Sequence, residues 1–128
     1  NILVYTDDSD NQRKSGVAMD LVEQSMLSRK GVISTQVLQE YFVAATRKMG
    51  LEAEFAQQRL ELFSVLDLVV IAYDDILNAI NLHRLYGFSF WDSLIVNAAK
   101  QSNCSVLYSE DLQHGQQLEG LTVINPFI

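Results

Sequence analysis

Asp92 is a carboxylate inside an otherwise apolar segment, and its position calls for a chemical explanation. Apolar residues recur at helical spacing from Phe90 to Lys100, which predicts a helix that begins near Phe90 and buries one side. Burying an ionised carboxylate without a partner is costly. Ser89 and Asp92 fit the S-x-x-D signal of a helix start, in which the acid bonds back to the cap. The alternative is that Asp92 faces a cleft and holds a cation.

Further carboxylates suggest where such a cation could bind. Glu40 lies in an apolar turn of another predicted helix, and Glu110 and Asp111 directly follow a short apolar run. Several carboxylates on one rim repel each other unless they are protonated or bridged by a cation. Oxygen ligands with few nitrogen or sulfur groups suit Mg²⁺ or Mn²⁺, whereas one distant cysteine and His114 make a weak case for zinc. A divalent ion of this kind can acidify a water and stabilise charge on a phosphoryl oxygen, so phosphodiester hydrolysis is the expected reaction.

Short apolar runs alternate with amphipathic segments along the chain, and together these elements would have to position the acids. Strands are expected at 2–5, 32–34, 66–71, 105–108 and 121–124. Helices are expected at 12–27, from 34 or 35 to 49, at 52–63, from 74 or 75 to 85, and at 90–100. Residues 113–120 form a polar connection. This alternation predicts a single α/β domain over residues 1–128, with three layers and a mostly parallel five-stranded sheet.

Ligands of parallel α/β sheets bind beyond the carboxyl ends of the strands. Asp7 and Asp8 follow the first predicted strand, and Asp111 follows the fourth. Glu40 begins the helix after the second strand, so it belongs to the same edge of the sheet. Asp92 precedes the fourth strand and reaches that edge only through a crossover. The carboxylates are therefore expected at one end of the domain.

Composition limits the classes of function. A formal charge of −7 argues against a protein that holds nucleic acid by a broad basic surface, but a nuclease with an acidic, cation-filled centre remains compatible. No apolar run reaches about 18 residues, so no membrane span is expected. Cys104 is the single cysteine, cannot form an intrachain disulfide, and favours a cytoplasmic protein.

An ordered set of segments resembles the successive motifs of PIN domains, most closely those of bacterial VapC-type toxin ribonucleases. The similarity covers essentially the whole chain, and its ordered set of motifs is more specific than any one of them. The segments are 1–5, Glu40, 90–99 and 107–112.

The resemblance implies a sheet of order 3-2-1-4-5 and a Mg²⁺- or Mn²⁺-dependent site that cuts RNA. Glu40, Asp92 and Asp111 match catalytic and metal-binding acids of the family by position. Ser109 matches a small hydroxyl residue beside the last acid, and Glu110 supplements Asp111 or replaces it in the outer shell of the metal. For a toxin-type enzyme, the resemblance also implies a homodimer and a small antitoxin whose tail blocks the acidic cleft.

One departure concerns the start of the first strand, which in the family usually opens with Asp-x-Asn. Asn1 matches the last residue of that triplet, so the first aspartate would lie two residues before the sequence given. Asp7 and Asp8 are poor substitutes because they fall beyond the far end of the strand. A protein that lacks this acid would be a PIN-like binding module without nuclease activity. A response-regulator receiver fits less well, because no lysine follows the last strand.

Overall fold

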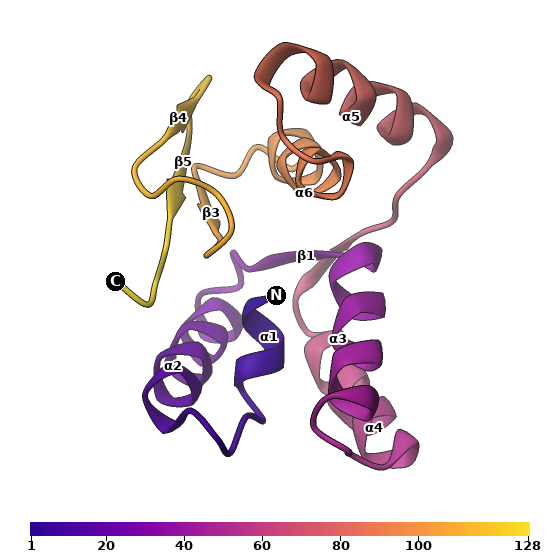
Figure 1. The fold of residues 1–128 in the computed structure, drawn as a ribbon, viewed down its shortest axis with the longest axis vertical. Coiled ribbons are helices and arrows are strands. Elements are labelled where there is room, and N and C mark those ends of the chain that lie inside the picture. Colours follow the sequence, from indigo (N-terminus) through magenta and orange to yellow (C-terminus); the bar gives the residue numbers. More distant parts are fainter. The chain divides into compact units, whose positions relative to one another are not determined.

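The structure is a computed structural model that describes all residues, Asn1–Ile128, as six helices and five short strands (Figure 1). The chain divides into two compact units. The first unit comprises Asn1–Leu68 and Phe127, and the second comprises Val69–Pro126 and Ile128. No helix combines the length and the apolar character that crossing a membrane requires.

The first unit is mainly helical. Its elements are α1 (Ile2–Tyr5), α2 (Gln12–Ser28), β1 (Val32–Ser34), α3 (Thr35–Arg47), α4 (Ala53–Phe63) and β2 (Asp67–Val69), whose last residue is assigned to the second unit. The apolar faces of α1, α3 and α4 form one core of Leu3, Tyr41, Ala45, Ala56 and Phe63. The rings of Tyr41 and Phe63 meet edge to face with centroids 5.3 Å apart, an arrangement that aromatic pairs favour.

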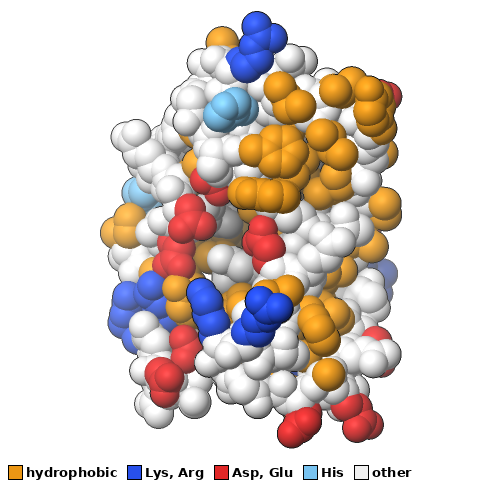
Figure 2. Space-filling model, turned by 45° about the vertical axis from the view of Figure 1, so that its right-hand side comes forward, with side chains coloured by type: hydrophobic (Ala, Val, Ile, Leu, Met, Phe, Trp, Pro, Cys, Tyr) orange, Lys and Arg blue, Asp and Glu red, His pale blue; other side chains and the backbone are white.

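The second unit packs two helices with a small sheet. Its elements are α5 (Tyr73–Tyr86), α6 (Phe90–Gln101), β3 (Val106–Tyr108), β4 (Gln117–Leu118) and β5 (Leu121–Ile124). Gly87 ends α5 in the left-handed conformation, with φ 76°, which a glycine adopts without strain. The core joins one face of α6 to the sheet through Val96, Ala99, Leu118, Leu121 and Val123. Figure 2 shows hydrophobic side chains gathered on the surface at the upper right, over the helices of this unit.

The five predicted amphipathic helices are present with ends that differ by at most two residues from those expected. The N-terminal segment differs in kind, because Ile2–Tyr5 forms α1 instead of a strand. The side chain of Asn1 accepts a hydrogen bond from the Leu3 amide, and the Thr6 amide and hydroxyl both donate to the Leu3 carbonyl. These local bonds pair backbone groups of the segment within a helical turn. The segment therefore does not need the hydrogen bonds of a neighbouring strand.

The predicted five-stranded parallel sheet of order 3-2-1-4-5 does not form. The structure has a two-stranded sheet of β1 and β2 and a three-stranded sheet of order β3-β5-β4. β3 and β5 are parallel, whereas β4 and β5 are antiparallel. The helical conformation of Ile2–Tyr5 explains the difference, because the expected sheet requires this segment as its central strand.

The segment predicted as a polar connection contains the additional strand β4. Glu119 and Gly120 link β4 to β5, and both have positive φ, at 51° and 88°. Two-residue hairpin turns of type I′ require positive φ at both central residues. The tight turn therefore converts part of the connection into an antiparallel hairpin.

Candidate metal-binding site

Glu40 occupies a fixed position on α3. The hydroxyl of Ser34 caps this helix by accepting a hydrogen bond from the Val37 amide. The Nε2 of Gln36 donates to the Oε1 of Glu40 over 2.8 Å, and Gln36 is only 5% exposed. A buried donor one helical turn away restricts the rotamers of the half-buried carboxylate, so Glu40 is oriented before any ligand binds.

Asn1 anchors α1 to the same region of α3. Its Nδ2 donates to the Val37 carbonyl over 2.8 Å, while its Oδ1 accepts from the Leu3 amide over 2.9 Å. Val37 precedes Glu40 by less than one helical turn. Asn1 therefore ties α1 to the backbone of α3 near the candidate residue Glu40, in addition to starting α1.

Asp7 belongs to a structural network of the first unit. Its Oδ2 accepts hydrogen bonds from the Tyr41 hydroxyl over 2.6 Å and from Nε of Arg59 over 3.1 Å. Burial raises the pKa of Tyr41 well above its usual value, and the hydrogen bond to the Asp7 carboxylate adds to this effect. The carboxylate thus connects the end of α1 with α3 and α4 through its Oδ2.

Asp92 has a different environment at the start of α6. Its amide donates to the Ser89 hydroxyl over 3.0 Å, so the serine half of the predicted capping arrangement is present. No hydrogen bond from the Ser89 amide to the Asp92 carboxylate completes it. The half-buried carboxylate lies in the first turn of α6, near the positive end of the helix macrodipole.

Ser109, Glu110 and Asp111 follow β3. The Ser109 amide donates to the Ile124 carbonyl over 3.0 Å, and its hydroxyl accepts from the Asp111 amide over 3.1 Å. Asp111 is exposed, and the next residue, Leu112, is anchored in the core. The loop therefore has a defined backbone while it presents the Asp111 carboxylate to solvent.

α6 and β3 are consecutive elements of the second unit, are joined by Ser102–Ser105, and pack against each other. Asp92 lies in the first turn of α6, and Asp111 lies in the loop that follows β3. These two candidate acids therefore belong to neighbouring elements of one unit.

The sequence-predicted site residues are divided between the two units. Glu40 and Asn1 belong to the first unit, whereas Asp92, Ser109, Glu110 and Asp111 belong to the second. Within either unit, no three His, Cys, Asp or Glu side chains gather closely enough to hold a metal ion. The donor set itself fits a hard divalent cation, because it consists of carboxylate oxygens without sulfur or imidazole ligands.

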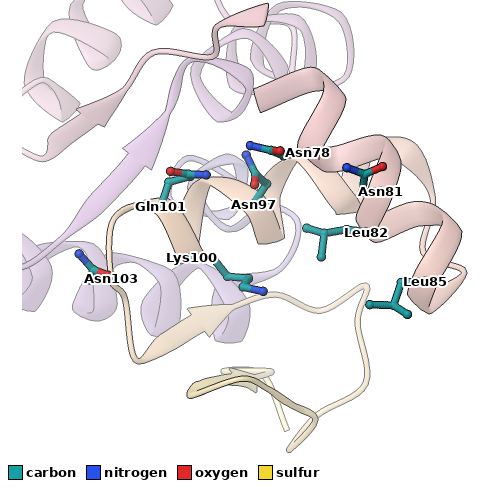
Figure 3. A pocket seen from close by; sticks show the side chains of 8 residues that line it. All are labelled: Asn78, Asn81, Leu82, Leu85, Asn97, Lys100, Gln101 and Asn103. Atoms are coloured by element: carbon teal, nitrogen blue, oxygen red, sulfur yellow. The ribbon is translucent and has the colours of Figure 1, made fainter. Parts of the chain in front are cut away.

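A polar pocket between α5 and α6 was not predicted from the sequence (Figure 3). Its volume is about 500 Å³, and its polar lining consists of the carboxamides of Asn78, Asn81, Asn97, Gln101 and Asn103 with the ammonium group of Lys100. Scattered amides carry no recognisable spacing in the sequence, so no sequence signal marked them. None of the candidate acids is among the residues that line this pocket.

Comparison with known families finds that the PIN domain profile matches residues 1–116. The matched range begins at Asn1 and includes Glu40, Asp92 and Asp111. No curated protein sequence matches the chain.

Proposed function

The chain belongs to the PIN domain family, a superfamily of nucleases, and on this basis we propose that it is a divalent-metal-dependent endoribonuclease. It hydrolyses RNA phosphodiesters with Mg²⁺ or Mn²⁺ as the cofactor. The observation that carries the proposal is the family match over residues 1–116, which spans both units and includes all three candidate acids. PIN nucleases act on RNA, and a nuclease whose acids bind a cation is compatible with the formal charge of −7.

Glu40, Asp92 and Asp111 are the proposed metal ligands and catalytic residues. When bound, the cation supplies an acidified water and stabilises negative charge on the phosphoryl oxygen. The protein contributes orientation: Gln36 holds Glu40, the Ser89 cap fixes the first turn of α6 that carries Asp92, and the hydroxyl of Ser109 holds the loop that carries Asp111. Glu110 is proposed to support Asp111, and Asn1 to support Glu40 through Val37.

We further propose that the two units are halves of one PIN domain over residues 1–128. The family match supports this organisation because it continues across the boundary between Leu68 and Val69. The resemblance to VapC-type ribonucleases supports the finer assignment of a toxin that acts in the cytoplasm, forms a homodimer and is inhibited by a small antitoxin. The antitoxin would block the acidic cleft.

The test is cleavage of a mixed RNA pool by the full-length protein in the presence of Mn²⁺. We expect Asp92→Asn and Glu40→Gln to retain their fold and to lose at least ~100-fold in rate, because each removes the negative charge of a ligand. Glu54→Gln is the matched control for Glu40→Gln, because Glu54 is an exposed acid in the first turn of α4. Cleavage by all variants without metal would reject the mechanism, and absence of cleavage by the parent would indicate a binding module.

The role of Gln36 can be tested by measuring metal binding. Gln36→Met keeps the length of the side chain but removes the donor to Glu40. We expect Mn²⁺ affinity, measured by titration calorimetry, to fall by about 10-fold to 100-fold, as when an outer-shell hydrogen bond to a metal ligand is lost. Unchanged Mn²⁺ affinity would show that Glu40 does not depend on Gln36.

A further inference from the structure

The polar pocket of the second unit lies between facing sides of two helices. Its lining positions 78, 81, 82 and 85 share one face of α5, and positions 97, 100 and 101 share one face of α6 (Figure 3). Its volume of about 500 Å³ lies within the range of ~300–1,000 Å³ that small-molecule sites occupy. No Asp or Glu is among the lining residues, although the chain as a whole is acidic. The pocket therefore suits a polar ligand that carries a negative charge.

The carboxamides of this pocket have hydrogen-bonding capacity that the fold does not use. Four of the five are exposed and their side chains make no hydrogen bond within the protein: Asn78, Asn81, Gln101 and Asn103. Asn97 is only 5% exposed, and its Nδ2 donates to Oδ1 of Asp75 over 3.5 Å, which leaves its own oxygen as an acceptor. Asparagine favours helices less than most residues, so three asparagines on facing sides of two helices indicate a use other than helix stability. A ligand can supply their missing partners.

Lys100 is the only charged residue that lines the pocket. Its Nζ pairs with Oε2 of Glu119 over 2.8 Å, but the side chain of Glu119 is 68% exposed. Water screens such an ion pair, so an anionic group of a ligand can compete for the ammonium. Leu82 and Leu85 complete the lining, and Figure 3 shows Leu82 projecting from α5 toward α6. The pocket thus combines an apolar surface, amide donors and acceptors, and one exchangeable cation.

We propose that this pocket binds an adenine nucleotide, with the base against the two leucines, its edge paired with carboxamides, and its phosphate on Lys100. A carboxamide presents a donor beside an acceptor, which matches the N6 donor and N7 acceptor of adenine. Guanine presents two acceptors on the same edge and is typically bound by Arg or Lys, and no Arg lines the pocket. The proposal does not depend on nuclease activity, because Glu40, Asp92 and Asp111 are not lining residues.

The first experiment is calorimetric titration of the full-length protein with adenosine monophosphate (AMP) in EDTA, which keeps divalent cations out of the measurement. We expect a dissociation constant of about 1 mM or tighter, and binding of guanosine monophosphate at least ~10-fold weaker. Absence of AMP binding, or equal binding of the two nucleotides, would overturn the proposal.

A pair of double variants tests the carboxamides in the same titration. Asn81→Ala/Gln101→Ala removes one amide from each helix and should weaken AMP binding at least ~10-fold. Gln57→Ala/Gln58→Ala is the matched control, because it removes two exposed amides of α4 in the first unit, and it should bind AMP like the parent. Equal affinities of the two double variants would place AMP elsewhere and reject the site.

The phosphate position is tested through the ion pair of Lys100. Glu119→Gln releases the ammonium, so AMP should bind about 2-fold to 5-fold more tightly, whereas adenosine, which has no phosphate, should bind as before. Lys100→Met should reduce the affinity for AMP to that for adenosine. An equal response of AMP and adenosine to Glu119→Gln would contradict the placement of the phosphate.

A free nucleotide and an adenosine at the end of an RNA strand share this chemistry, and a last titration distinguishes the two sources. The trinucleotides UUA and UUU are compared with AMP in EDTA, with Asn81→Ala/Gln101→Ala as the control. Binding of UUA more tightly than AMP, lost in the double variant and absent for UUU, assigns the pocket to an RNA end. Binding of AMP at least as tightly as UUA assigns it to a free nucleotide. Equal binding of UUA and UUU, unchanged in the double variant and without AMP binding, rejects the pocket as a nucleotide site.

Discussion

At the scale of single residues, the acids of this chain differ in whether the fold already uses their oxygens. Asp7 accepts from Tyr41 and Arg59, and this network joins three helices of the first unit. Asp92 keeps its carboxylate free of hydrogen bonds, and Asp111 is exposed beside the Ser109 hydroxyl. Glu40 accepts from Gln36 through one oxygen, so the candidate acids differ in how far the fold already uses them, which residue type alone does not reveal.

The Tyr41–Asp7 hydrogen bond predicts a pH-dependent effect on stability. Tyr41→Phe should lower the free energy of unfolding by about 1–2 kcal/mol near neutral pH, because the half-buried Asp7 loses a donor. The raised pKa of Tyr41 means that the folded state retains the phenol proton more strongly than the unfolded state. The stabilisation that the protonated phenol of Tyr41 provides is therefore present below about pH 10 and is lost as the pH rises further.

Urea denaturation at several pH values measures this effect. The parent should lose stability more steeply above about pH 10 than Tyr41→Phe. Tyr108→Phe, which removes the hydroxyl of an exposed tyrosine, is the control and should behave like the parent. Parallel pH profiles for the parent and Tyr41→Phe would contradict the assignment.

At the scale of elements, two glycines show why the same substitution can have opposite effects. Gly16 lies within α2, and a Cβ added there would meet no atom within 4 Å. Gly16→Ala should therefore stabilise the protein by roughly 0.5–1 kcal/mol through helix propensity. Gly120 has a φ of 88° in the turn between β4 and β5, so Gly120→Ala should destabilise by about 1 kcal/mol or more. Thermal denaturation of both variants tests the pair, and shifts of the same sign would contradict it.

Elements with a strong helical period could be predicted from the sequence. The Ser89 cap and the apolar spacing after Phe90 located α6 correctly. The run Ile2–Tyr5 was predicted as a strand because a four-residue apolar segment has no decisive period, and the cap provided by Asn1 determines its helical form. β4 was missed because Gln117–Leu118 shows no strand pattern, and the structure shows the turn beside it through the positive φ of Glu119 and Gly120.

The candidate site, like the fold, could be predicted from the sequence only in part. The sequence identified Glu40, Asp92 and Asp111 as chemically suited to a cation, and the structure adds the local supports that orient them, above all Gln36. The amide pocket between α5 and α6 depends on residues from two helices facing each other. Which residues of the two helices face each other depends on how the helices pack, and the residue pattern of either helix alone does not show this.

At the scale of the whole molecule, the family match and the two compact units lead to a test of domain organisation. If residues 1–128 are one domain, calorimetry should record a single unfolding transition with equal calorimetric and van't Hoff enthalpies. Mn²⁺ at 100 times its dissociation constant should stabilise the parent by about 2.7 kcal/mol and Asp92→Asn by much less. Two separate transitions in the presence of Mn²⁺ would contradict a single domain.

The boundary between Leu68 and Val69 also has a consequence for synthesis on the ribosome. Glu40 emerges with the first unit, but Asp92 and Asp111 are added later. A nascent chain therefore holds an incomplete set of acids until Asp111 has been added. If these acids cut RNA together, the messenger that encodes the protein is not exposed to the complete set before the ribosome has passed the codon for Asp111.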